Sequence, residues 1–127
     1  MPLVDSDVLV LHLRGHEAAR DYLVRVRRAL GPLAISVVSV AEISGGMRSA
    51  ERRSVWDLLG SFVRLPVDDD IARRAGEFAR RFRRSHSGIG IADYLIAATA
   101  DIHELELATL NVKHFPMMRG LRPAFTI

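Results

Sequence analysis

The chain has 127 residues, 49% hydrophobic and 26% charged, with a formal net charge of +3 at pH 7. This length predicts a single domain over residues 1–127, in which folding buries about two-thirds of the surface that the unfolded chain exposes. The absence of cysteine excludes disulfides, thiolate metal sites and a cysteine nucleophile. No apolar run reaches the roughly 18 residues that a membrane span needs, and the N-terminus has no leader pattern, so we expect a cytoplasmic protein with no membrane partner.

The basic side chains are almost entirely arginine, and Lys113 is the one lysine. Arginine binds phosphate groups bidentately, which makes nucleic acid a natural partner. A genome rich in arginine codons explains the bias equally well, and a net charge of +3 is too small to require a polyanionic partner. The composition therefore permits nucleic-acid binding without establishing it.

The first third of the chain is predicted to begin with a strand over residues 3–11, although Asp5 and Asp7 interrupt its apolar pattern. Residues 16–30 place apolar side chains three or four positions apart, which predicts an amphipathic helix that stops at the Gly-Pro pair after it. Residues 33–38 are apolar and β-branched, which indicates a buried strand.

In the middle third, Ser39 is expected to cap a short helix that carries Glu42 and ends at two glycines. Residues 50–62 repeat the amphipathic helical pattern, and residues 63–67 indicate a short strand. Residues 68–84 predict a long helix with acids in its first turn and arginines in its last, an arrangement that complements the helix dipole.

Arginines crowd the C-terminal half of this long helix: Arg80, Arg81, Arg83 and Arg84. They could follow an RNA backbone, although a solvated helix end explains them equally well. After a glycine-containing loop, residues 91–102 are nearly all apolar and predict a core helix. Residues 105–110 and 124–127 predict two strands.

Strands and helices alternate along the chain, which predicts the α/β class, as a three-layer α/β/α domain with a central, mostly parallel sheet of four to five strands flanked by helices. In such sheets, ligands bind beyond the carboxyl ends of the strands. Asp5, Glu42 and Asn111 lie at or just after predicted strand ends. We therefore expect a functional site at that edge of the sheet.

Three carboxylates occupy apolar surroundings, where an unpaired charge costs several kcal/mol: Asp5, Glu42 and Asp93. A turn or cap explains Asp5 and the helix dipole explains Glu42, but Asp93 enters a helix with almost no polar face. If the three segments converge, their carboxylates form a pocket suited to a hard cation such as Mg²⁺ or Mn²⁺.

Four segments, taken in order, resemble the motifs of PIN-domain ribonucleases. Residues 3–9, 39–43 and 91–100 are similar to the three acidic motifs of that family, and residues 107–115 to its terminal motif. The similarity covers essentially the whole chain, and the third motif is its most specific part. The subgroup that the chain resembles is the VapC-type toxins of bacterial type II toxin–antitoxin systems.

The resemblance implies a PIN-like fold and a metal-dependent endoribonuclease that uses Mg²⁺, with Mn²⁺ as an alternative. Asp5, Glu42 and Asp93 would hold the cation, which activates a water for attack on a phosphodiester. Where the family often has two further acids, this chain has Asn111 and His114. Asn111 can still hydrogen-bond a water of the metal, so we include it among the catalytic residues. The resemblance also implies an RNA substrate (tRNA or rRNA), an inhibitory VapB-like antitoxin and a homodimer.

Two other functions remain open at this point. Asp5 and Asp7 also fit the opening motif of haloacid-dehalogenase-type phosphatases, although the chain is short for that fold and its single lysine lies near the end. A catalytically silent PIN-like binding module is the second alternative, because Asn111 weakens the acidic cluster. The hydroxyls of Ser6 and Thr109 could orient a water, or could simply stabilise a turn and a strand end.

Overall fold

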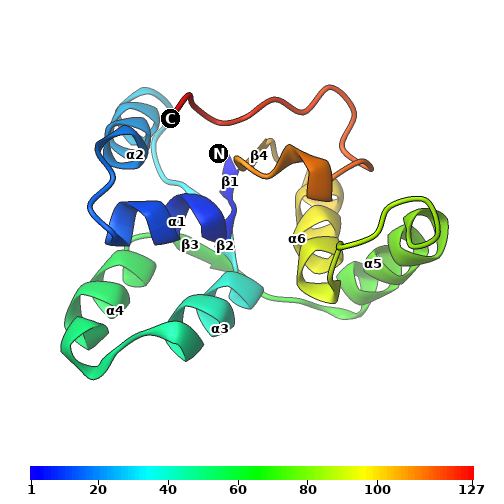
Figure 1. Cartoon of the computed structure of the whole chain (residues 1–127), viewed down its shortest axis with the longest axis horizontal. Coiled ribbons are helices and arrows are strands. Elements are labelled where there is room, and N and C mark those ends of the chain that lie inside the picture. Colours follow the sequence, from blue (N-terminus) through cyan, green and yellow to red (C-terminus); the bar gives the residue numbers. More distant parts are fainter.

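The computed structural model describes residues 1–127, and in it strands and helices alternate as expected (Figure 1). The four strands are β1 (Leu3–Val4), β2 (Ala34–Ser36), β3 (Val63–Leu65) and β4 (Leu107–Ala108). The six α-helices are α1 (Ser6–Leu13), α2 (Glu17–Leu30), α3 (Val37–Gly46), α4 (Arg52–Gly60), α5 (Asp69–Phe82) and α6 (Ile91–Ile102). Short 3-10 turns, η1 (Ser49–Glu51) and η2 (Val112–His114), precede α4 and follow β4.

The sheet has the order β3-β2-β1-β4, and every pair of neighbouring strands is parallel. Leu3 of β1 pairs with Ala34 on one side and with Leu107 on the other. Because the strands are parallel, all four carboxyl ends lie at one edge of the sheet. The predicted parallel sheet of four to five strands is confirmed.

Alternation along the strands divides the core between two faces of the sheet. Val4 and Ile35 pack with side chains of α1, α2 and α4, whereas Leu3 and Ala34 pack with α6. Helix α5 lies outside α6, and a small third cluster, which includes Ala75 and Ala98, fills the space between them. The three-layer α/β/α arrangement is therefore confirmed (Figure 1).

The prediction of one strand over residues 3–11 is wrong, because β1 is only two residues long and Ser6 begins α1. Asp5 decides the change of structure, since its carboxylate accepts a hydrogen bond from the Ser6 N–H at the start of the helix. The side chains of α1 are apolar nearly all round, so their pattern has no helical period that the sequence could reveal.

The residue that caps helix α3 is Ser36, not Ser39. The Ser36 hydroxyl accepts from the Val38 N–H at 3.0 Å, so β2 ends and α3 begins earlier than predicted. The helix predicted over residues 50–62 is divided into η1 and α4.

At the end of the chain, residues 124–127 form no strand. Ala124 instead donates one backbone hydrogen bond to the Thr109 carbonyl at 2.9 Å. The tail therefore rests beside the end of β4 without extending the sheet. None of the six helices has the length and apolar character needed to cross a membrane.

Candidate active site

Asp5 occupies the central position at the carboxyl edge of the sheet, directly after β1, and only 6% of its surface is exposed. Its Oδ1 accepts from the Ser6 N–H at 2.8 Å, and its Oδ2 accepts from the Thr109 hydroxyl at 2.7 Å. Thr109 follows β4, the strand that pairs with β1. The parallel pairing of β1 with β4 thus joins two residues that are 104 positions apart.

Burial raises the pKa of Asp5 to about 7, and the nearby charge of Asp7 and the weaker effect of Asp93 add to the increase. The hydrogen bonds from Thr109 and Ser6 act in the opposite direction because they favour the ionised form. No ion pair in the structure includes Asp5 or Asp7. Asp5 is therefore a buried acid that forms no ion pair with a cationic side chain.

Asp7 is a residue whose importance the sequence did not reveal. Its Oδ2 accepts from the Leu110 N–H at 2.9 Å, the Asn111 N–H at 3.1 Å and the Thr109 hydroxyl at 3.2 Å. These bonds fasten the turn after β4 to the first turn of α1. In the sequence, Asp7 draws attention only because it lies two residues after Asp5.

Glu42 reaches the same region by a different route from the one expected. It lies in the second turn of α3 and is exposed, so neither a strand end nor a first-turn dipole effect places it. Its Oε1 accepts from the Ser6 hydroxyl at 2.8 Å, and the Ser6 and Ser39 hydroxyls also lie 2.8 Å apart. Glu42 is therefore joined to the Asp5 segment through Ser6.

Asp93 lies in the first turn of α6, with 23% of its side chain exposed. Its Oδ2 accepts from the Gly90 N–H at 3.1 Å and lies 3.1 Å from Nδ1 of His114. The charge of Asp93 makes a small contribution to the raised pKa of Asp5. Asn111 is exposed and contributes its backbone N–H to the site.

The donor atoms fit a hard cation, although no group of three His, Asp or Glu side chains is placed to hold a metal ion directly. Mg²⁺ usually keeps several waters and binds through one or two carboxylates. Asp5 and Asp93 supply two carboxylates whose mutual repulsion a cation would relieve. Metal binding by Asp5, Glu42 and Asp93 stays a prediction.

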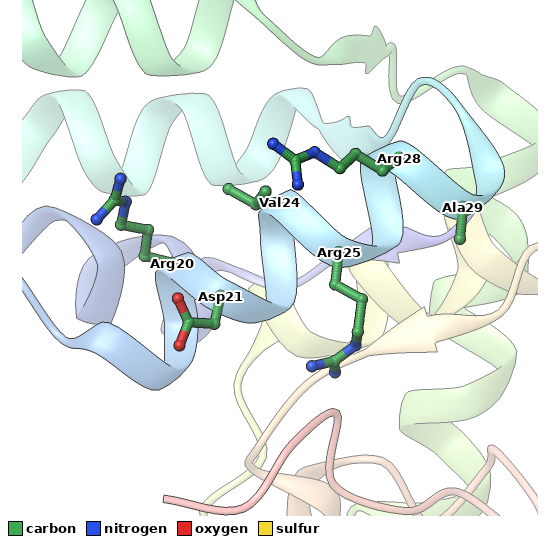
Figure 2. A pocket seen from close by; sticks show the side chains of 6 residues that line it. All are labelled: Arg20, Asp21, Val24, Arg25, Arg28 and Ala29. Atoms are coloured by element: carbon green, nitrogen blue, oxygen red, sulfur yellow. The ribbon is translucent and has the colours of Figure 1, made fainter.

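Two hollows flank α1, and Arg14 lines both of them. One, of about 450 Å³, includes Glu42 and Arg48, and the other, of about 390 Å³, includes Asp7 and Asn111. A separate hollow on α2 contains none of the candidate residues, and three of its six lining residues are arginines (Figure 2).

The fold and this site define a class of protein, the α/β/α domains with carboxylates gathered beyond the ends of parallel strands. The PIN domain family matches residues 3–117, and the chain belongs to this family. It is 65% identical to Ribonuclease VapC10 of Mycobacterium tuberculosis over 127 residues, which cover all of this chain and 95% of that protein. It is 40% identical to Ribonuclease VapC19 of the same species, over 98% of this chain and 100% of that one.

Among solved structures, the toxin–antitoxin complex from Klebsiella pneumoniae matches with a TM-score of 0.82 and 26% identity, over 100% of both chains. The resemblance carried by the four motifs is thereby confirmed, and with it the PIN-like fold. Membership of this family removes the haloacid-dehalogenase alternative.

Proposed function

We propose that the chain is a metal-dependent endoribonuclease and the toxin of a toxin–antitoxin pair that acts on RNA in the cytoplasm. The observation that carries the proposal is the buried Asp5 carboxylate, which has no cationic partner and shares its region with Asp93. The 65% identity to a protein named a ribonuclease supports the reaction class.

In this proposal Asp5 and Asp93 hold one Mg²⁺ or Mn²⁺ ion, and Glu42 contributes through Ser6 or through waters of the ion. A bound cation of this kind supplies a water of lowered pKa and stabilises the charge that develops on a phosphodiester. Thr109 and the Ser6 N–H hold the two oxygens of Asp5 in fixed directions. Asn111, exposed at the edge of the site, is available to hydrogen-bond water or RNA.

His114 acts on Asp93 in the same way that Thr109 acts on Asp5. Its Nδ1 lies 3.1 Å from Oδ2 of Asp93, so its N–H can fix the direction of that carboxylate. Groups that orient a ligand carboxylate are worth about 10- to 100-fold in metal affinity or activity. The histidine that replaces the usual family acid therefore supports the site.

The proposal includes two protein partners, a VapB-like antitoxin and a second copy of the chain. Support for the antitoxin comes from the matching Klebsiella pneumoniae structure, which is a toxin–antitoxin complex. Helices α2 and α4 leave large apolar side chains exposed, as protein interfaces do: Val24, Leu30 and Trp56. Light scattering of the purified chain, alone and with its antitoxin, tests both assemblies.

The nuclease is tested by incubating the antitoxin-free protein with a structured RNA pool containing tRNA and rRNA, in Mg²⁺, in Mn²⁺ and in EDTA. Wild type should make discrete cuts that leave a 5′-phosphate and that disappear in EDTA. Asp93→Asn should lose cutting by at least 100-fold, while Asp57→Asn, on the exposed surface of α4, should cut normally. A folded wild type that cuts nothing would favour the silent binding module.

A further inference from the structure

The arginines of the α5 region fall into two groups in the structure. Arg73 pairs with Asp69 at 2.7 Å, and Arg74 pairs with Asp101 and, at 3.7 Å, with Glu77. The other four form no ion pair and are exposed; we call them the arginine end of α5, namely Arg80, Arg81, Arg83 and Arg84. Four adjacent cations thus lack a counter-charge from the protein.

The helix dipole accounts for only two of the four arginines in this second group. A cation in the last turn gains about 0.3–1 kcal/mol from the dipole, which suits Arg80 and Arg81. Helix α5 ends at Phe82, however, so Arg83 and Arg84 lie past its last residue. Like charges three or four positions apart repel by about 0.2–0.5 kcal/mol per pair, so each added arginine opposes the next.

The position of the arginine end relative to the carboxylates is fixed by the packing of α5 on α6. The two helices pack against each other, and residues 83–90 form a loop that runs from the end of α5, at the edge of the molecule, back to the start of α6 (Figure 1). Ala79 and Tyr94 belong to one buried cluster, and Arg74 pairs with Asp101, so the two helices run antiparallel. Tyr94 directly follows Asp93, and the joining loop ends at Gly90, whose N–H binds Asp93.

Helix α2 offers a matched comparison at the opposite edge of the sheet. Arg25 and Arg28 are also exposed and unpaired, and they line the hollow shown in Figure 2. They lie in the half of α2 that leads into the start of β2. Because the strands are parallel, the start of β2 is at the edge away from the carboxylates.

We propose that the arginine end of α5 binds the phosphate backbone of the RNA substrate and leads it to the site carboxylates, of which Asp93 lies at the start of α6. The inference rests on the proposed nuclease function and adds the surface that holds its substrate. Guanidinium groups bind phosphodiesters bidentately and without regard to base sequence, so this surface supplies affinity and direction. The loop with Gly88, whose φ is +86°, carries the chain from that surface to Asp93.

The test compares two double variants of equal charge change, R83Q/R84Q beside the site and R25Q/R28Q on α2. Binding of a fluorescently labelled single-stranded RNA is measured by anisotropy in EDTA at several salt concentrations, and kcat and KM are measured in Mg²⁺. R83Q/R84Q should weaken binding on the order of tenfold at 0.1 M salt and reduce the slope of log K against log salt by about 1.4, or about 0.7 for each lost phosphate contact. Its KM should rise while kcat changes less than about twofold.

R25Q/R28Q should bind and cut RNA as wild type does. Glutamine and arginine have similar helix propensities, so both double variants should fold, and a melting curve checks this. If wild type cuts RNA but the two double variants have equal KM values and equal salt slopes, this inference is overturned and the proposed function stands. A wild type that neither binds nor cuts RNA overturns the proposed function and this inference with it.

Discussion

Asp5 is a carboxylate whose surroundings oppose its charge. Burial and the neighbouring acids raise its pKa to about 7, whereas in the unfolded chain it titrates near 3.8. The folded protein therefore holds a proton on Asp5 more tightly than the unfolded chain does between about pH 4 and pH 7. In the absence of metal, the contribution of Asp5 to the free energy of unfolding therefore falls as the pH rises through this range.

Asp5→Asn removes this titration while keeping the shape of the side chain. The Thr109 hydroxyl can turn and donate to Asp7, 3.2 Å away, so the hydrogen bonds are retained. Near pH 4 we expect the variant and wild type to have the same free energy of unfolding. At pH 8 the free energy of unfolding of the variant should be higher than that of wild type by about 3 kcal/mol. Urea denaturation in EDTA at four pH values measures the difference. Parallel curves for the two proteins would show that Asp5 titrates normally.

Asp7→Ala tests the residue that fastens the β4 turn to α1. Without the carboxylate, the N–H groups of Leu110 and Asn111 lose their acceptor, and the turn is free to move. We expect kcat to fall at least tenfold with KM nearly unchanged, and the free energy of unfolding to fall by about 1–3 kcal/mol. Asp7→Asn keeps one acceptor oxygen and should recover part of both losses. An Asp7→Ala enzyme with the kcat of wild type would show that Asp7 is not needed for the site.

Among the residues, the sequence singled out candidate acids but did not show how they are connected. Asp5 and Asp93 stood out because each interrupts apolar surroundings. Three connections depended on tertiary structure: Ser6 to Glu42, Asp7 to the β4 turn, and His114 to Asp93. No sequence spacing encodes contacts over such separations.

At the scale of the elements, helices with a polar face or a clear stop could be predicted closely. Residues 16–30 and 91–102 were predicted as helices, and α2 and α6 match them to within one residue. Helices α1 and α3 were misplaced because their side chains are mostly apolar, so no period separates helix from strand. Their starts depend on caps, and Ser36, which lies inside the strand predicted over residues 33–38, caps α3.

Ser36→Ala tests the cap that the structure selects. Ser36 is fully buried, and its hydroxyl satisfies the Val38 N–H, so its loss should lower the free energy of unfolding by about 1 kcal/mol. Ser54→Ala, at an exposed position of α4, is the control and should change it by less than about 0.5 kcal/mol. Urea denaturation compares them; equal values would mean that Ser36 is not the cap.

Tyr94→Phe tests the packing between α5 and α6. Tyr94 is 3% exposed, and its hydroxyl has no hydrogen-bond partner among the protein atoms. Because an unsatisfied buried hydroxyl costs free energy, its removal should raise the free energy of unfolding by about 1 kcal/mol. Tyr22→Phe, in the buried cluster that contains Val4 and Ile35, serves as the comparison and should change the free energy of unfolding little. Destabilisation by Tyr94→Phe would reveal a partner for the hydroxyl.

At the scale of the whole molecule, the topology of the sheet assembles the site. Parallel pairing of β1 with β4 joins Asp5 to Thr109, and helices from the two faces bring Glu42 and Asp93 to the same edge. Alternation of elements was enough to predict this architecture from the sequence. The course of residues 116–127 could not be predicted, because the tail is held by side-chain packing and one backbone hydrogen bond, with no strand partner.

The central claim is that Asp5 and Asp93 together hold a divalent cation. The most direct measurement is a titration of the purified, RNA-free protein with Mn²⁺ at pH 8, in which the electron paramagnetic resonance signal of free Mn²⁺ reports how much ion is bound. We expect saturable binding by wild type and by Asp57→Asn, and at least tenfold weaker binding by Asp5→Asn and Asp93→Asn. Equal Mn²⁺ binding by all four proteins would contradict it.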